Sequence, residues 1–267
     1  MRDGSAARGR GRDRLPLASG QVSLTTARAT VVRDVLLVCL TFGAGAVDAI
    51  SFLGLGRVFT GNMTGNLVLL GLAAAQEKGS EVVRSAVSLG AFCAGVLLAV
   101  SLVAVISSRR AEPRGSRMWP VGVSVVLALE VLVQAGVLAG WLTVGGHPGA
   151  TFEVVLVGLS ALAMGMQSDA VAALGVAGVT STYVTGTLTG LLRGIVVGGE
   201  DVPDRLRRAA VLAGLLVGAV VGGVLLVEAR RFAPVLPLAV TVTVLVAAGW
   251  AFRGERSRTV EGLGERP

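Results

Sequence analysis

Residues 58–71 read VFTGNMTGNLVLLG and hold two copies of Thr-Gly-Asn, four residues apart, at the start of an apolar run. A spacing of four places the two copies on one helical face, one turn apart. The face consists of small or polar residues: Thr60, Gly61, Asn62, Thr64, Gly65 and Asn66. Buried hydroxyl and amide groups need hydrogen-bond partners, so the surroundings of this stretch decide what kind of protein the chain forms.

The composition around this stretch excludes an ordinary soluble domain. Hydrophobic residues make up 53% of the 267 residues, charged residues make up 15%, and the mean hydropathy is +0.75. A soluble domain of this length cannot bury so much apolar surface, so we predict an all-α, polytopic helical membrane protein. The net charge of +7 comes from arginines in tails and loops, which favours the positive-inside pattern over nucleic-acid binding.

Helices that cross about 30 Å of hydrocarbon need about 20 apolar residues. Suitable runs cover residues 31–53, 86–106, 119–142, 152–174, 209–227 and 233–252. Two further runs, 61–75 and 180–198, are shorter or rich in Thr and Gly. The sequence therefore predicts six to eight transmembrane segments in a single membrane domain, residues 31–252. A basic tail (residues 1–30) and a second tail (253–267) are expected to be disordered.

The opening stretch also recurs later in the chain. A shift of 121 residues aligns DAISFLGLGRVFTGNMTGNLVLL (48–70) with DAVAALGVAGVTSTYVTGTLTGL (169–191). Matched aliphatic residues carry little weight, whereas the match of Asp48 with Asp169 and the repeated Thr-Gly pairs carry more. We predict two related halves, about 31–142 and 152–252, as in many secondary transporters.

The orientation of the halves depends on the two short segments. If every apolar run crosses the membrane, the basic loop 107–117 lies outside, against the positive-inside rule. If the short segments re-enter, six spans remain, three in each half, and the second half is inverted. Both termini then face the cytoplasm. A third alternative keeps the short segments as spanning but broken helices.

The short segments allow two interpretations. The GxxxG pairs Gly61 with Gly65 and Gly186 with Gly190 let helices pack closely. Alternatively, re-entrant helices that begin near residues 60 and 182 present free N–H groups to an anion or a polar solute. The candidate solute-binding residues are Thr60, Asn62, Thr64, Asn66, Gln167, Thr182, Tyr183, Thr185 and Thr187.

Three acidic residues are candidates for proton coupling: Asp48, Glu130 and Asp169. A carboxylate inside the bilayer costs about 2.5 to 3.5 kcal/mol on insertion scales, so it is usually paired, solvated or functional. The alternatives are structural roles: the two aspartates cap helix ends at the water boundary, and Glu130 forms a hydrogen bond with Gln134, one helical turn later.

The sequence shows no motif of the common enzyme classes. Lys78 is the only lysine, so no GxxxxGK[ST] pattern exists, and neither GxSxG nor HExxH occurs. Cys39 and Cys93 lie in apolar runs, and His147 lies in a polar turn without a Cys or carboxylate cluster beside it. We expect no enzyme activity, no catalytic residue, no metal and no cofactor.

Two blocks resemble the signatures of the YoaK family of bacterial inner-membrane proteins, also called domain of unknown function 1275. They are GAVDAISFLGLGRVFTGNMTGNLVLLGLA (45–73) and AMGMQSDAV (163–171) with LGVAGVTSTYVTGTLTGLL (174–192). The resemblance implies a multi-helix membrane protein that is often suspected of transport. It matches Asp48, Gly56, Asn62, Thr64, Gly65 and Asn66 to the first block, and Gln167, Tyr183, Thr185, Gly186 and Thr187 to the second.

The chain departs from the family pattern at Gly61, where Ala is more usual, and at Asp169, where a small neutral residue is expected. Ala172 and Ala173 also stand where basic residues are expected. These departures weaken the pairing of the aspartates and leave Asp48 as the better candidate.

Two function hypotheses follow. The first is a secondary transporter or permease-like protein for a small polar or anionic solute, with proton coupling as a secondary feature. The second is a non-transporting scaffold or lipid-interacting protein whose Gly/Thr stripes only pack helices. We expect a multi-pass protein of the bacterial cytoplasmic membrane, with the bilayer and a small solute as partners and no nucleic acid; homo-oligomer formation stays open.

Overall fold

The computed structural model describes residues 18–109, 118–176, 184–197 and 201–253. Over these residues the chain forms α-helices and one 3-10 turn, without a strand, so the predicted all-α class is confirmed. The elements are α1 (Ala18–Gly54), α2 (Met63–Ala75), α3 (Gly79–Arg109), α4 (Val121–Thr143), α5 (Ala150–Ala172), α6 (Val184–Val197), α7 (Val202–Glu228), η1 (Arg230–Phe232) and α8 (Val235–Ala251).

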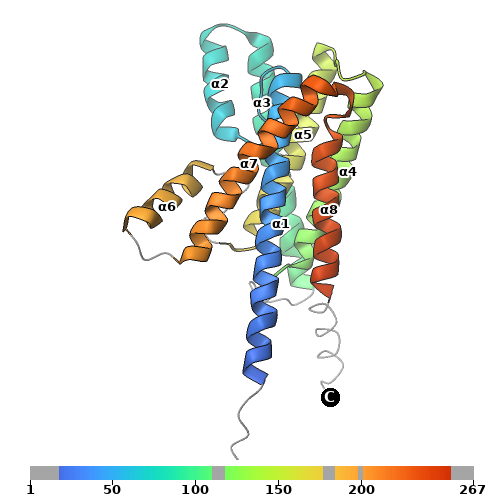
Figure 1. The fold of residues 1–267 in the computed structure, drawn as a ribbon. Coiled ribbons are helices and arrows are strands. Elements are labelled where there is room, and N and C mark those ends of the chain that lie inside the picture. The colour runs from blue at the N-terminus through green and yellow to red at the C-terminus, as the bar shows by residue number, and fades with distance from the viewer. Residues whose placement is uncertain (1–17, 110–117, 177–183, 198–200, 254–267) are drawn as a thin grey trace, which may run out of the picture.

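Six helices of the described chain are long and apolar enough to cross a membrane: α1 from Ala27 onward, α3, α4, α5, α7, and α8 with η1. The helices α2 and α6 have only 13 and 14 residues. At 1.5 Å per residue they reach about 20 Å, which is too short for a hydrocarbon core of about 30 Å. Figure 1 places α2 beside the end of the bundle where α1 ends and α3 begins. The structure therefore agrees with the six-span alternative.

One sequence-based boundary needs correction. Residues 18–30, expected in the disordered tail, form the first turns of α1. The expectation equated the helix with its apolar run, but a helix can continue past hydrocarbon wherever its residues have adequate helix propensity. Residues 1–17 and 254–267 of the two expected tails lie outside the described part of the chain.

The helices pair across the two proposed halves. The most extensive contacts of α1 are with α7, and those of α3 are with α5; α4 also packs on α5, and α8 on α1. In Figure 1, α1 lies between α7 and α8. We call the end where α1 begins and α8 finishes the terminal end, and the opposite end the α2 end.

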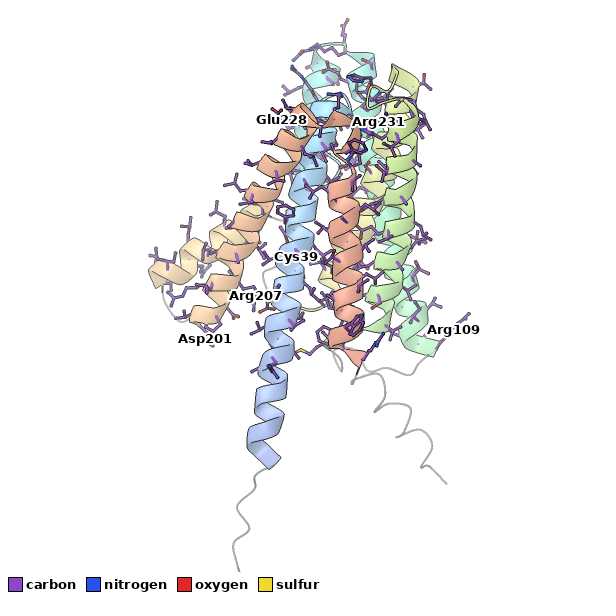
Figure 2. All side chains as sticks on the ribbon, turned by 45° about the vertical axis from the view of Figure 1, so that its right-hand side comes forward. Cys39, Arg109, Asp201, Arg207, Glu228 and Arg231 are labelled. Atoms are coloured by element: carbon purple, nitrogen blue, oxygen red, sulfur yellow. The ribbon has the colours of Figure 1, made fainter. Side chains whose placement is uncertain are left out.

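Each end of the bundle has its own cluster of buried hydrophobic side chains. At the terminal end, the Trp119 and Phe252 rings stack with centroids 5.8 Å apart. At the α2 end, the fully buried Trp141 donates its indole N–H to the carbonyl of Arg230, at 2.9 Å. Figure 2 shows Arg109, Asp201 and Arg207 at the terminal end, and Glu228 and Arg231 at the α2 end.

Candidate functional site

The loop between α1 and α2 is held by the carboxylate of Asp48. Gly56 and Arg57 turn the chain with φ angles of 78° and 61°, in the left-handed region that glycine adopts most easily. Asp48 Oδ1 then accepts the backbone N–H groups of Thr60 (2.9 Å) and Gly61 (2.7 Å). Asp48 therefore holds the loop that precedes α2 by binding backbone donors of this loop.

Asn66 fixes the same loop from the other side. Its side-chain amide is fully buried, accepts the N–H of Phe59 at 2.9 Å and donates to the carbonyl of Phe59 at 2.6 Å. It also donates to Ser88 Oγ on α3, at 3.0 Å, and Ser88 donates to the carbonyl of Phe59 at 2.7 Å. Asn66 therefore ties the loop to α3 and is occupied by protein groups.

The polar side chains of this stretch do not converge. Thr60 is buried, with its hydroxyl 3.4 Å from Ser51 Oγ. Asn62 is exposed and caps α2 by accepting the N–H of Gly65 at 3.1 Å. Thr64 is exposed. The four candidate residues thus divide between inward structural contacts and the outer surface.

The second segment is described only in part. Thr182 and Tyr183 lie outside the described residues. Thr185 is exposed and Thr187 is buried, in the same order as Thr64 and Asn66 in the first segment. Gln167 lies apart from them on α5, where it donates to the carbonyl of Leu40 at 3.1 Å.

The GxxxG glycines have mixed surroundings. A Cβ on Gly61 would meet the Asp48 carboxylate, and one on Gly65 would meet the Phe59 ring and the Asn62 amide. The closest neighbours of these two glycines therefore belong to the loop and to α1's carboxylate. Gly186 on α6 is partly buried, and a Cβ on Gly190 would collide with the Arg208 guanidinium of α7.

A second polar cluster lies in the interior between α4 and α8. Glu130 has 0% exposure, and its Oε1 accepts from Gln134 Nε2 at 2.6 Å. Gln134 also donates to Thr241 Oγ1 at 3.3 Å, and Thr241 donates to the carbonyl of Pro237 at 3.1 Å. Glu130 Oε2 is buried without a hydrogen-bond partner among the described residues. Asp169, by contrast, is only partly buried near the end of α5.

A cavity of about 40 Å³ adjoins this cluster. It lies between α1, α4, α5 and α8, and its polar lining comes from Ser51, Gln134 and Ser160. A volume of this size is large enough to hold water. Since Gln134 both lines the cavity and bonds to Glu130, it connects the buried carboxylate to this space.

Comparison with known proteins identifies the family. A family model described as "Protein of unknown function (DUF1275)" matches residues 36–248. The chain belongs to this family. The UPF0700 transmembrane protein YoaK of Bacillus subtilis (strain 168) is 38% identical over 178 residues, which cover 67% of this chain and 71% of that protein. No solved structure matches the chain. Together with the six apolar helices, these matches confirm the YoaK resemblance and a multi-pass integral membrane protein.

Close helix contacts among the described residues of this DUF1275 protein involve glycines outside the two GxxxG pairs named above. A Cβ on Gly45 of α1 would collide with the carbonyl of Leu215, and one on Gly218 of α7 with the carbonyl of Phe42. The signal was present in the sequence, since Gly214, Gly218 and Gly222 follow one another at intervals of four.

Matching contacts join α3 to α5 in the same protein. A Cβ on Gly165 would collide with the carbonyl of Phe92, and one on Gly95 with the carbonyl of Leu162. In both helix pairs, therefore, the backbones touch without an intervening side chain.

Proposed function

We propose that this DUF1275 protein is a secondary transporter for a small polar solute, coupled to protons. We place it in the bacterial cytoplasmic membrane with both termini in the cytoplasm. The observation that carries the proposal is the matching set of contacts in the pairs α1–α7 and α5–α3. Inverted repeats with a site near the midplane are a common plan of secondary transporters.

The glycine contacts of the two pairs correspond by constant shifts in residue number. Gly45 and Phe42 of α1 correspond to Gly165 and Leu162 of α5, each 120 residues later. For the partner helices the shift is 123 residues: Leu215 and Gly218 of α7 correspond to Phe92 and Gly95 of α3. The two glycine contacts between α1 and α7 thus correspond to the two between α5 and α3, which supports an internal repeat.

The ion pairs support inversion of the second half. Arg84 of α3 pairs with Glu153 of α5 at 3.7 Å, and Arg207 of α7 pairs with Asp34 of α1 at 3.4 Å. The two arginines are again 123 residues apart. The acidic partners, Asp34 and Glu153, are 119 residues apart, one position short of the shift of 120 between α1 and α5. Because Arg84 follows the first turn of α3 at the α2 end, and Arg207 lies at the terminal end, the two corresponding arginines are at opposite ends of the bundle.

This correspondence changes the sequence-based pairing of the acidic residues. A shift of 120 residues places Asp48 against Ser168 rather than Asp169, so a pair of equivalent aspartates receives no support. Glu130 is the better proton carrier, because an ionisable group buried inside a membrane bundle with an unsatisfied oxygen is usually functional.

The geometry favours a neutral or cationic polar solute over an anion. Asp48 already occupies the N–H groups before α2, so an anion there would face a carboxylate instead of free donors. The interior cavity, which extends toward the α2 end, offers the hydroxyls of Ser51 and Ser160 and the amide of Gln134. We therefore propose the solute site at this cavity, beside Glu130.

The basic residues of the terminal end support the proposed orientation. Arg109 and Arg207 lie there, together with the entry of α1. Under the positive-inside rule this end faces the cytoplasm.

The competing function, a non-transporting scaffold, is favoured by one observation: Asp48 and Asn66 serve as structural ties of the first Thr-Gly segment. The two functions differ in whether protons and solutes cross the membrane together. Proteoliposomes that enclose a pH-sensitive dye separate them, with gradients of amino acids, sugars and amines tested in turn.

We expect at least one gradient to move protons in wild type and not in Glu130→Gln. Glu228→Gln, which changes an exposed carboxylate on α7, is the matched control and should retain the flux. Wild-type liposomes that behave like protein-free liposomes with every solute would support the scaffold.

A further inference from the structure

A groove of about 360 Å³ lies on the outside of the bundle, apart from the interior cavity beside Gln134. It runs between α1, the loop before α2, and α7, and its walls include Phe52, Phe59 and Leu215. Leu53 on its lining is 56% exposed, so the groove is open at the surface. Its size and apolar walls fall in the range of small-molecule sites.

The groove combines aromatic rings with a single carboxylate. Phe52 and Phe59 stack with ring centroids 4.8 Å apart. Asp48 is the only ionisable residue of the described lining. Its hydrogen-bond partners among the described residues are backbone N–H groups, and none of the ion pairs among these residues includes it.

We propose that this groove binds a lipophilic organic cation, with the positive charge near Asp48 and the apolar groups against Phe52, Phe59 and Leu215. A carboxylate attracts a cation strongly where apolar walls keep the local dielectric constant low. Aromatic faces add a further attraction for organic cations. An anion of the same shape is repelled, and an acyl chain fills the groove without using the carboxylate. The proposal rests on the groove alone and is independent of transport.

The test uses two probes of nearly equal shape and opposite charge, tetraphenylphosphonium and tetraphenylborate. Binding of each radiolabelled ion is measured by equilibrium dialysis against the full chain in nanodiscs of zwitterionic lipid, with empty nanodiscs as background. We expect saturable binding of the cation above background and no saturable binding of the anion.

Two variants locate the site. Asp48→Asn removes the charge but keeps an oxygen that can accept the N–H groups of Thr60 and Gly61, and should weaken cation binding at least tenfold. Ala49→Trp fills the groove beside an unchanged Asp48 and should abolish binding. Asp204→Asn, a carboxylate of α7 outside the groove lining, should bind like wild type.

Equal saturable binding of cation and anion would overturn the proposal, as would wild-type cation binding no greater than that of empty nanodiscs. Cation binding that persists in a folded Ala49→Trp protein would also overturn it. If Asp48→Asn fails to fold, the charge selectivity of wild type and the result with Ala49→Trp still test whether the groove binds the cation.

Discussion

Asn66 of α2 and Thr187 of α6 occupy the same place in the two Thr-Gly segments, and both are buried. Asn66 reaches Ser88 on α3. The residue that corresponds to Ser88 on α7, 123 positions later, is Val211, which has no polar side-chain group. Figure 1 shows α2 running alongside the bundle, whereas α6 inclines away from it. A repeated sequence motif therefore does not imply repeated chemistry, because α3 has Ser88 where the proposed repeat places Val211 on α7.

The largest effect is expected at the close-packed glycines of α7 and α3. Gly218→Ala forces a methyl group into the carbonyl of Phe42 and should lower the free energy of unfolding by about 2 to 3 kcal/mol. Gly95→Ala should do the same in the other half. Thermal unfolding in detergent measures both.

Gly223→Ala on the same helix α7 is the control, since the nearest atom to its added Cβ would be 3.7 Å away. It should be neutral or stabilising by about 0.5 kcal/mol, through the lower flexibility of Ala in the unfolded chain. A Gly218→Ala protein as stable as Gly223→Ala would show that the backbones of α1 and α7 are not in close contact at Gly218.

The next effect separates the two short segments. Asn66→Ala leaves the N–H and carbonyl of Phe59 without their amide partner and should cost about 2 to 3 kcal/mol. Thr187→Ala removes a single hydroxyl and should cost about 1 kcal/mol. Thermal unfolding compares them, with the exposed Thr64→Ala as a variant that should change nothing. Equal losses at Asn66 and Thr187 would mean that the segments are chemically equivalent after all.

Glu130 provides a contrast to Asn66. Both are buried polar residues, but Glu130 has an oxygen without a hydrogen-bond partner among the described residues. Glu130→Gln keeps the shape and removes the buried carboxylate, so stability should be unchanged or rise by about 1 kcal/mol. Thermal unfolding checks this expectation. A loss as large as that of Asn66→Ala would show that Glu130 is a structural tie.

The smallest effects are expected at the ion pairs of Arg84 and Arg207. Arg84→Gln and Arg207→Gln should each cost about 0.5 to 1 kcal/mol. Arg207 should cost more, because it pairs with both Asp34 and Asp204, at 3.4 and 2.9 Å. Raising the salt concentration should reduce the difference in the free energy of unfolding between each variant and wild type. A loss that salt does not change would argue that these arginines act by packing.

Much of the fold follows from local patterns in the sequence. The apolar runs predicted six to eight spanning segments, and six helices of the described chain are long enough to span. The spacing of Glu130 and Gln134 allowed a hydrogen bond as one of two alternatives for Glu130, and this bond is present at 2.6 Å. The tie between Asn66 and Ser88 was not predictable, because it joins residues 22 positions apart across a turn. The pairing of α1 with α7 could not be predicted either, because many helices in this chain have glycines at a spacing that suits close helix packing.

The pairing of α1 with α7 has a consequence for biogenesis. Gly45 of α1 meets Leu215 of α7, so the first span inserts long before its main partner has been synthesised. Until then its glycine surface faces lipid or the translocation machinery. Either half expressed alone lacks the partners of its longest helices, so the two halves should assemble only when both are present in the same membrane.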